Sequence, residues 1–435
     1  MNHPTTQSQE NQDNRWAALS LSFWREILAD FHPRNFAVRL WNDTTLEAEE
    51  GQPTLFTFVL RHPGALRKMF LPANERTLGE AYIYDDFDVE GNLESAFALV
   101  EYLTRQNRGV GQNLKSLFQL LRLPSGSRAR GGRQAARLTG RRHSTERDRQ
   151  AVTYHYDVSN DFFSLWLGKR MLYSCAYFAT PSDDLDTAQE RKLDYVCRKL
   201  RLRPGERLLD IGCGWGGLLI YAASKYGVNA VGITLSRPQA DLAMDWVRRE
   251  GLSDRCQVLV KDYREVSALG MFDKLVSIGM FEHVGESRLP EYFERAWEVL
   301  HPGGVFLNHG IAQMVPMAPR KGPSFSEHYV FPDGELLPIS MTLRIAEEKG
   351  FEVRDLESLR EHYSLTLRHW IRRLEARREE ARSVTDESTY RVWRLFMSGA
   401  AHQFESCETN VYQALFVKPH QGKSGFPLTR NDWYQ

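Results

Sequence analysis

The chain has 435 residues, a length that predicts two or three domains rather than one. Apolar residues make up 42% of it and charged residues 26%, which is enough apolar surface for buried cores and excludes a wholly disordered, collagen-like or disulfide-stapled protein. Lys and Arg together number 56, as do Asp and Glu, so the zero net charge argues against a nucleic-acid partner and leaves only local electrostatic attraction.

The cysteines predict a reducing compartment. There are five, an odd number, without any C-x-x-C pair, which argues for the cytosol and against a structural zinc site; we expect no metal. The polar N-terminus lacks the apolar core of a signal peptide, and no stretch approaches the ~18 uninterrupted apolar residues of a membrane span. If the protein acts on lipid, we expect it to do so from the water side.

The N-terminal part predicts a small α+β domain over 15–125. Residues 1–14, rich in Gln, Asn and Thr, are expected to be a disordered lead. Two segments of the domain have strand-like composition, and two carry apolar residues at helical spacing. The predicted strands are 36–43 and 54–62, and the predicted helices are 93–105 and 113–123.

An arginine-rich segment, 126–150, follows this domain. Between Arg128 and Arg149 it has eight arginines against only Glu146 and Asp148, with Gly and Ser interspersed. This composition favours a solvated, flexible linker. The alternative is a polybasic patch for anionic phospholipid, in which each charge contributes about 1 kcal/mol near the surface.

Strands and helices alternate from 151 to 420, which predicts an α/β domain with a mostly parallel sheet and helices on both faces. The last two strands flank two arginine-rich helices and are expected to close the sheet edge, before a tail over 421–435. The predicted strands lie at 206–213, 228–236, 256–262, 272–280, 303–312, 351–359 and 411–419.

A glycine turn joins the first strand of this domain to its first helix. LLDIGCGWGG places Gly212, Gly214 and Gly217 in G-x-G-x-x-G spacing, which dinucleotide and S-adenosyl-methionine sites share because both need close backbone approach. Asp210 extends the pattern to D-x-G-x-G-x-G, and no acid follows GITLS to bind an NAD ribose. Asp262 ends the third strand, where such a sheet exposes groups to a nucleoside. These features favour the methyl donor.

Seven motifs, in chain order, resemble the cyclopropane fatty acid synthase family of methyltransferases. The likeness covers about 152–419, and YSCAYF and MFEHVG are more specific than the glycine turn. It implies a class I methyltransferase fold, Rossmann-like with a seven-stranded, mostly parallel sheet, beside a smaller lipid-handling N-terminal domain. The motifs are YHYDVSNDFFSLWLG, MLYSCAYF, DIGCGWGG, GITLSRPQ, SIGMFEHVG, LNHGI and YVFPDGELLP.

The resemblance also implies the reaction and its setting. The donor would be S-adenosyl-methionine, and the acceptor would be the cis double bond of an unsaturated phospholipid acyl chain. The protein would be cytoplasmic, associated peripherally with an anionic membrane surface at the inner face of the membrane, and a homodimer.

Family positions map onto the donor site as well. The tyrosine and serine of YSCAYF would meet the methionine end of the donor, and the glycine turn would pass beneath it. Thr234 and Gln239 would replace the usual ribose acid, since a hydroxyl and an amide can each hydrogen-bond a diol. Tyr263 fills the aromatic position beside adenine, but Arg264 follows where some members have Glu, a departure at the adenine amino contact. The predicted donor site comprises Tyr173, Ser174, Asp210, Gly212, Gly214, Gly216, Thr234, Ser236, Gln239, Asp262 and Tyr263.

Ring closure would require a base. An isolated double bond is a poor nucleophile, so methyl transfer depends on positioning, which can supply about 7–11 kcal/mol of the barrier. Transfer leaves a carbocation, from which a proton must then depart. The resemblance implies that bound bicarbonate takes it, held by Glu282, His309, Tyr363 and backbone groups of Cys175 and Ile311. Taken singly, His309 is better explained as a core residue, Glu282 as a helix cap and Cys175 as a small buried side chain, but five matches at family positions together argue against coincidence.

Three alternatives remain. The same fold and donor could yield a methyl- or methylene-branched product through loss of a different proton. A non-catalytic lipid-binding protein would have a damaged donor site, whereas Asp210, Gly212, Gly214 and Glu282 are intact. An NAD-dependent oxidoreductase is disfavoured by the missing ribose acid.

Overall fold

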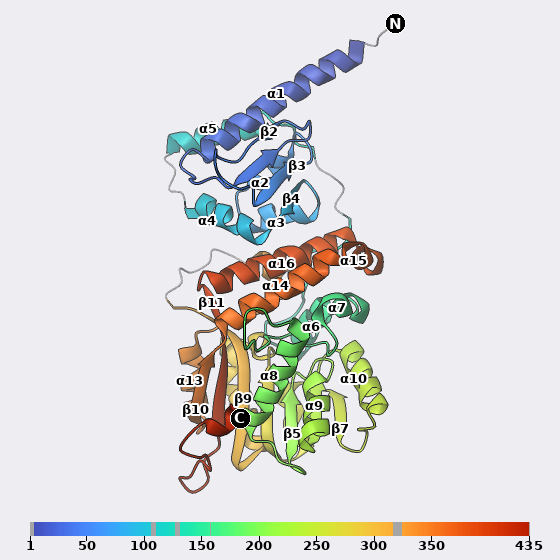
Figure 1. Cartoon of the computed structure of the whole chain (residues 1–435), viewed down its shortest axis with the longest axis vertical. Helices are drawn as coiled ribbons and strands as arrows, with labels where there is room; N and C mark the ends of the chain where they lie inside the picture. Colours follow the sequence, from blue (N-terminus) through green and yellow to red (C-terminus); the bar gives the residue numbers. More distant parts are fainter. Residues whose placement is uncertain (1–3, 106–109, 127–130, 157, 316–323, 435) are drawn as a thin grey trace. The chain divides into compact units, whose positions relative to one another are not determined.

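The computed structural model describes residues 4–105, 110–126, 131–156, 158–315 and 324–434, which form two compact units (Figure 1). Unit 1 comprises Met1–Gln134, Gly322–His328 and Asp386–His402, and unit 2 comprises Ala135–Lys321, Tyr329–Thr385 and Gln403–Gln435.

This division differs from the predicted one, because most of α16 (Glu387–Glu405) belongs to unit 1 although it lies within 151–420. Buried Arg391 of α16 donates to the carbonyl oxygen of Tyr82 at 3.0 Å and to the carboxylate of Asp88 at 2.9 Å. These partners lie 309 and 303 positions away in sequence. Hydrogen bonds between residues so far apart in sequence cannot be predicted from the composition of the chain.

Unit 1 is an α+β unit, as predicted. Its sheet has the order β2-β1-β3-β4, with β1 parallel to β3 and the other pairs antiparallel. The strands are β1 (Phe36–Arg39), β2 (Thr45–Leu46), β3 (Phe56–Leu60) and β4 (Phe87–Gly91). The helices are α1 (Pro4–Ile27), α2 (Ala65–Phe70), α3 (Glu75–Ile83), α4 (Phe97–Arg105) and α5 (Val110–Leu121).

Helix α1 corrects the prediction of a disordered lead over 1–14, since it already begins at Pro4. Its C-terminal half buries Phe23 and Trp24, and the Trp24 ring lies 5.4 Å from that of Phe58. This packing anchors the helix, and the preceding Gln and Glu residues extend it because they lose little side-chain freedom in a helix. Residues 1–3 lie outside the described part of the chain.

The arginine-rich segment is also more ordered than a free linker. Helix α6 (Thr145–Tyr156) begins within it, and the Arg147 guanidinium donates to the Asp333 carboxylate, from Nη2 to Oδ1 at 3.0 Å. Arg142 reaches the same carboxylate at 4.0 Å. Arg128 and Arg130 lie outside the described residues. The C-terminal part of the segment is therefore anchored by acidic side chains of unit 2.

The sheet of unit 2 confirms the predicted seven-stranded fold. Its order is β10-β11-β9-β8-β5-β6-β7; the strands from β9 to β7 are parallel, and β11 and β10 extend the sheet in antiparallel pairing. The strands are β5 (Arg207–Ile211), β6 (Asn229–Thr234), β7 (Cys256–Val260), β8 (Phe272–Ile278), β9 (Leu300–Gln313), β10 (Glu352–Ser358) and β11 (Thr409–Val417).

Apolar cores lie on both faces of this sheet, as neighbouring residues of β5 demonstrate. Leu208 packs in a cluster with Leu219 of α9, whereas Leu209 packs in another with Phe293 of α11. Successive side chains of a strand point to opposite faces, so one strand supplies both cores. The helices of unit 2 include α7 (Asn160–Leu167), α8 (Leu185–Leu200), α9 (Gly217–Tyr226), α10 (Arg237–Arg249), α11 (Leu289–Val299), α13 (Ile339–Glu348), α14 (Arg360–Ala376) and α15 (Arg378–Val384), and α12 (Phe325–Tyr329) spans the boundary with unit 1. Within the described residues, no helix has both the length and the apolar character to cross a bilayer.

Candidate active site

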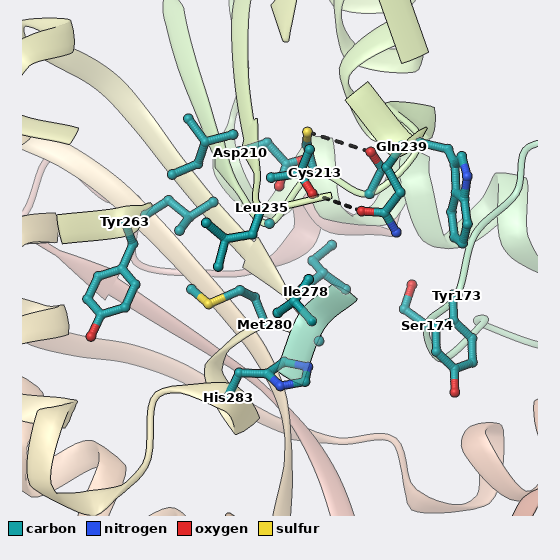
Figure 2. A pocket seen from close by; sticks show the side chains of 18 of the residues that line it. Tyr173, Ser174, Asp210, Cys213, Leu235, Gln239, Tyr263, Ile278, Met280 and His283 are labelled. Carbon is teal, nitrogen blue, oxygen red and sulfur yellow. Dashed lines mark hydrogen bonds between the residues drawn. The ribbon is translucent and has the colours of Figure 1, made fainter. Parts of the chain in front are cut away.

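A pocket opens in unit 2 where the parallel strands β5, β6, β7 and β8 end, the position at which open α/β sheets bind ligands. Figure 2 shows Tyr173 and Ser174 on one side of the pocket and Tyr263 on the other. Most of the predicted donor residues line it, namely Tyr173, Ser174, Asp210, Gly212, Gly214, Thr234, Gln239, Asp262 and Tyr263. The residues predicted for the methionine end and for the adenine end of the donor therefore lie on opposite sides of one pocket.

The glycine turn provides close backbone approach. Gly212 has φ +87°, and a Cβ there would lie 2.6 Å from the Cβ of Met280, so no larger residue fits. Gly214 has φ +54°, and its Cβ position meets no atom within 4 Å among the described residues. The turn thus presents bare backbone to the pocket, which fits a ligand as large as S-adenosyl-methionine.

Two predicted donor residues, Gly216 and Ser236, do not line the pocket. A Cβ at Gly216 would lie 3.1 Å from the Cβ of Ala243, so this glycine allows close packing against α10. Ser236 is the N-cap of α10, and its hydroxyl accepts from the backbone N–H of Gln239 at 3.4 Å. Gly217 lines the pocket instead.

Thr234 and Gln239 form the expected pair without a carboxylate. The Thr234 hydroxyl donates to Oε1 of Gln239 at 2.8 Å, and both side chains are buried. Nε2 of Gln239 is buried and has no acceptor in good hydrogen-bond geometry among the described residues, although the Tyr156 hydroxyl is near enough for this amide to oppose the rise of its pKa. An amide nitrogen needs an acceptor when buried, and a ribose hydroxyl would supply one.

Arg264, which stands where some family members have Glu, forms ion pairs at the predicted adenine end of the pocket. Its guanidinium donates to Asp262 in a bidentate pair, with both distances 2.7 Å, and also to Asp148 of α6 at 2.8 Å. The Asp262 carboxylate is therefore already engaged by this cation. The same guanidinium lies over the side chain of Tyr263, with its central carbon 5.0 Å from the centre of the tyrosine ring.

Lys192 of α8 is a pocket residue that the sequence reasoning missed. It is 1% exposed, and its Nζ donates to the Ser174 hydroxyl at 2.9 Å. Burial lowers the pKa of Lys192 to about 8 and raises the pKa of Asp210 to about 7, against their mutual attraction. The sequence did contain a signal that Lys192 is buried: it lies one turn after Ala188 and one turn before Val196, on the apolar face of α8.

Glu282 lies in a short 3₁₀ turn, Phe281–His283, between the pocket residues Met280 and His283 in sequence. Its Oε1 accepts from the backbone N–H of Ile311 at 2.8 Å, and its Oε2 is buried with no partner among the described residues. Burial raises the pKa of Glu282 to about 7, although the hydrogen bond from Ile311 opposes the shift. Glu282 is thus not a helix cap.

His309 lies on β9, two residues before Ile311 and so on the same face of the strand. Nε2 of Gln413, opposite on β11, lies 3.2 Å from Nδ1 of His309. Because an amide nitrogen only donates, the neutral imidazole carries its proton on Nε2, which is buried and unpartnered among the described residues. Burial, together with Lys192 and Lys199, lowers the pKa of His309 to about 3, so the ring stays neutral. Sequence reasoning missed Gln413 because only strand pairing brings it here.

Tyr363 and Cys175 meet at one carbonyl group. The Leu359 oxygen accepts from the Tyr363 backbone N–H at 3.0 Å and from the Cys175 thiol at 3.7 Å. Burial raises the pKa of the Tyr363 hydroxyl, and the charges of Cys175 and Glu282 add to this. The structure thus joins Glu282 to Ile311 and Cys175 to Tyr363. None of the five predicted base-site residues lines the donor pocket.

Comparison with known proteins agrees with this geometry. A sequence model described as mycolic acid cyclopropane synthetase matches residues 143–414, and a model of a domain of unknown function matches residues 23–113. A probable fatty acid methyltransferase of Pseudomonas putida is 39% identical over 402 residues, which cover 92% of this chain and 96% of that protein. The cyclopropane-fatty-acyl-phospholipid synthase of Escherichia coli strain K12 is 37% identical over 264 residues, covering 61% of this chain and 66% of that protein.

Solved structures are similar over 62–65% of the chain. The mycolic acid cyclopropane synthase CmaA1 complexed with SAH and CTAB has a TM-score of 0.59 and 35% identity, covering 62% of this chain and 97% of that one. The [4+2]-cyclase SpnF, at 20% identity and a TM-score of 0.54, shares the fold alone.

Proposed function

Because the chain belongs to the mycolic acid cyclopropane synthetase family of S-adenosyl-methionine-dependent methyltransferases, we propose that its acceptor is the cis double bond of an unsaturated phospholipid acyl chain and its product a cyclopropane ring. One observation carries the proposal: among the described residues, Glu282 Oε2 and His309 Nε2 are buried atoms without a hydrogen-bond partner, one an acceptor and the other a donor. A buried polar atom without a partner costs about 1–3 kcal/mol, and a ligand that pairs with both would recover this.

We propose that a bicarbonate ion pairs with both atoms. The neutral His309 offers Nε2–H to an anionic oxygen, and the Glu282 carboxylate accepts from a hydroxyl. Tyr363 adds a further donor from α14. Bicarbonate held there would supply the base that ring closure needs. The contribution of these residues is to orient the ion while their burial excludes water.

The donor pocket performs the positioning. S-adenosyl-methionine supplies a methyl group on a positively charged sulfur. The Thr234–Gln239 pair would bind the ribose hydroxyls of the donor. The turn at Gly212 and Gly214 would let the donor lie directly against the protein backbone, and Tyr263 would lie against the adenine ring. Fixing the donor at several points is what a weakly nucleophilic double bond requires.

A branched product is the second candidate. It is favoured by the name of the Pseudomonas putida relative, a probable fatty acid methyltransferase, which matches 92% of the chain and therefore includes both units. The donor pocket serves both outcomes, and the position of the lost proton decides between them.

The deciding experiment incubates the purified full chain with S-adenosyl-methionine labelled in its methyl group and vesicles of an unsaturated phosphatidylglycerol. We expect the labelled fatty acids to have gained one CH₂ unit, to resist mild hydrogenation and to show ring-proton resonances. A methylene branch takes up hydrogen and shows vinylic protons instead. Label that appears only when free unsaturated fatty acid replaces the vesicles contradicts a phospholipid acceptor.

A phospholipid acceptor requires a lipid-facing surface, and α5 of unit 1 offers one. Four large apolar side chains recur at helical spacing and are exposed, with the exposed cation Arg122 beside them, whereas Lys115 on the same helix pairs with Glu26 at 2.8 Å. An amphipathic helix of this kind inserts its apolar face among acyl chains while its cations meet lipid phosphates, and we propose an anionic phospholipid surface as its partner. The exposed fractions are 50% for Leu114, 38% for Leu117, 63% for Phe118 and 49% for Leu121.

A further inference from the structure

Lys192 is a buried lysine whose charge is not balanced by the glycine turn or by the predicted base site. The residue is 1% exposed, yet among the described residues no carboxylate pairs with its ammonium group within 4.0 Å; Asp210, which lines the same pocket, attracts it only from farther away. Its hydrogen-bond partner is a neutral hydroxyl, Ser174 Oγ at 2.9 Å. A buried charge without an opposite charge in contact is strongly unfavourable, so this position calls for an anion.

The surroundings place that anion inside the donor pocket. Lys192, Ser174 and Asp210 all line it. Ser174 receives one hydrogen bond from Lys192, and its carbonyl oxygen receives another from Gln189 at 2.9 Å, so the residue is fixed on both sides. Because Oγ accepts from the ammonium group, the hydroxyl hydrogen remains for an acceptor in the pocket.

The charge pattern of the donor then decides which end lies here. S-adenosyl-methionine carries a positive sulfur, a positive α-ammonium group and one negative group, the α-carboxylate. Like charges in a low-dielectric pocket repel strongly, which excludes the two cationic groups from contact with Lys192. Only the carboxylate complements the lysine.

We infer that Lys192 and Ser174 form a carboxylate subsite that binds the α-carboxylate of the methyl donor and so fixes the direction in which the donor lies. Lys192 is a positioning residue: it touches the end of the donor remote from the transferred methyl. The inference depends on the donor and is independent of the acceptor and of bicarbonate, so it can fail while the proposed function holds.

The test measures, by isothermal titration calorimetry on the full chain, the affinity for S-adenosyl-methionine and for its decarboxylated analogue, which lacks only the α-carboxylate. For Lys192→Met, we expect affinity for S-adenosyl-methionine to fall by about 10–100-fold, as for a charged hydrogen bond. Affinity for the decarboxylated analogue should change by less than about threefold. Lys192→Arg should recover part of the loss, and Lys225→Met, an exposed lysine on α9, should change neither affinity.

Equal losses for both donors would overturn the inference, since they would mean that Lys192 only supports the fold. So would a Lys192→Met variant that binds S-adenosyl-methionine normally. If that variant does not fold, the wild-type protein and Ser174→Ala decide. Wild-type affinities that are equal for the two donors contradict a carboxylate subsite, and a loss in Ser174→Ala confined to S-adenosyl-methionine supports it.

Discussion

The carboxylate of Glu282 accepts a hydrogen bond from the backbone N–H of Ile311 at 2.8 Å, just beyond the last β8–β9 pair, Ile278 with His309. The side chain takes the place of a strand partner that β8 no longer provides. This contact orients one carboxylate oxygen and leaves the other without a partner among the described residues. The geometry therefore separates a structural role for Oε1 from a chemical role for Oε2.

Substitution of Glu282 should separate these roles. Glu282→Gln keeps an oxygen for the Ile311 N–H but loses the carboxylate, so we expect the melting temperature to be no lower than in wild type while methyl transfer falls about 10²–10⁴-fold. Glu282→Ala should lose activity equally and also unfold at a lower temperature. Turnover is measured with labelled donor and unfolding by calorimetry; near-normal turnover of Glu282→Gln would falsify the assignment.

Burial of Glu282 also predicts a pH dependence of stability. Its pKa rises from 4.5 to about 7, so the folded protein binds more protons than the unfolded chain between these values. The free energy of unfolding should therefore fall in wild type, relative to Glu282→Gln, by up to about 1.4 kcal/mol per pH unit as the pH rises through that window. The difference should stop growing above about pH 7. Urea unfolding of both proteins from pH 4.5 to 8 measures it, and parallel curves would contradict a perturbed carboxyl.

Gln413 is predicted to set the tautomer of His309. In Gln413→Glu a carboxylate faces Nδ1, so the imidazole proton moves to Nδ1 and Nε2 becomes an acceptor that cannot bind an anion. We expect turnover to fall about 100-fold with donor affinity unchanged, because His309 is outside the donor pocket. Nitrogen NMR of the histidine reports the tautomer. Full activity with a shifted tautomer would remove His309 from the base site.

Charge on the apolar face of α5 should weaken lipid binding. Phe118→Glu places a carboxylate where an acyl chain is expected, and we predict at least a tenfold loss of binding to phosphatidylglycerol vesicles in a sedimentation assay. Gln112→Glu, exposed on the same helix but outside the apolar face, carries the same charge and should change binding less than about threefold. Equal losses would indicate that only net charge matters. Unchanged binding of both variants would exclude α5 as the docking face.

The seven strands of the larger sheet, the glycine turn and the family could be predicted from the sequence, whereas α1, α2, α3 and β4 of unit 1 were not predicted. The predicted features are local: a turn that requires φ +87° at Gly212 needs glycine whatever surrounds it, and strands and helices differ in the spacing of their apolar residues. The same reasoning named most of the residues that line the donor pocket. It included Gly216 and Ser236 because they share a motif with true lining residues, although their side-chain positions face α10.

Tertiary structure alone decided the contacts that give those residues their chemistry. Gln413 orients His309 across 104 positions, Ile311 holds Glu282 across 29, and Arg391 joins α16 to unit 1 across more than 300. Lys192 looks like an ordinary charged residue of a helix until packing places its ammonium group in the pocket. The reason is physical: a pattern along the chain records which face of an element is buried, whereas hydrogen bonds and pKa shifts depend on which other segment buries it.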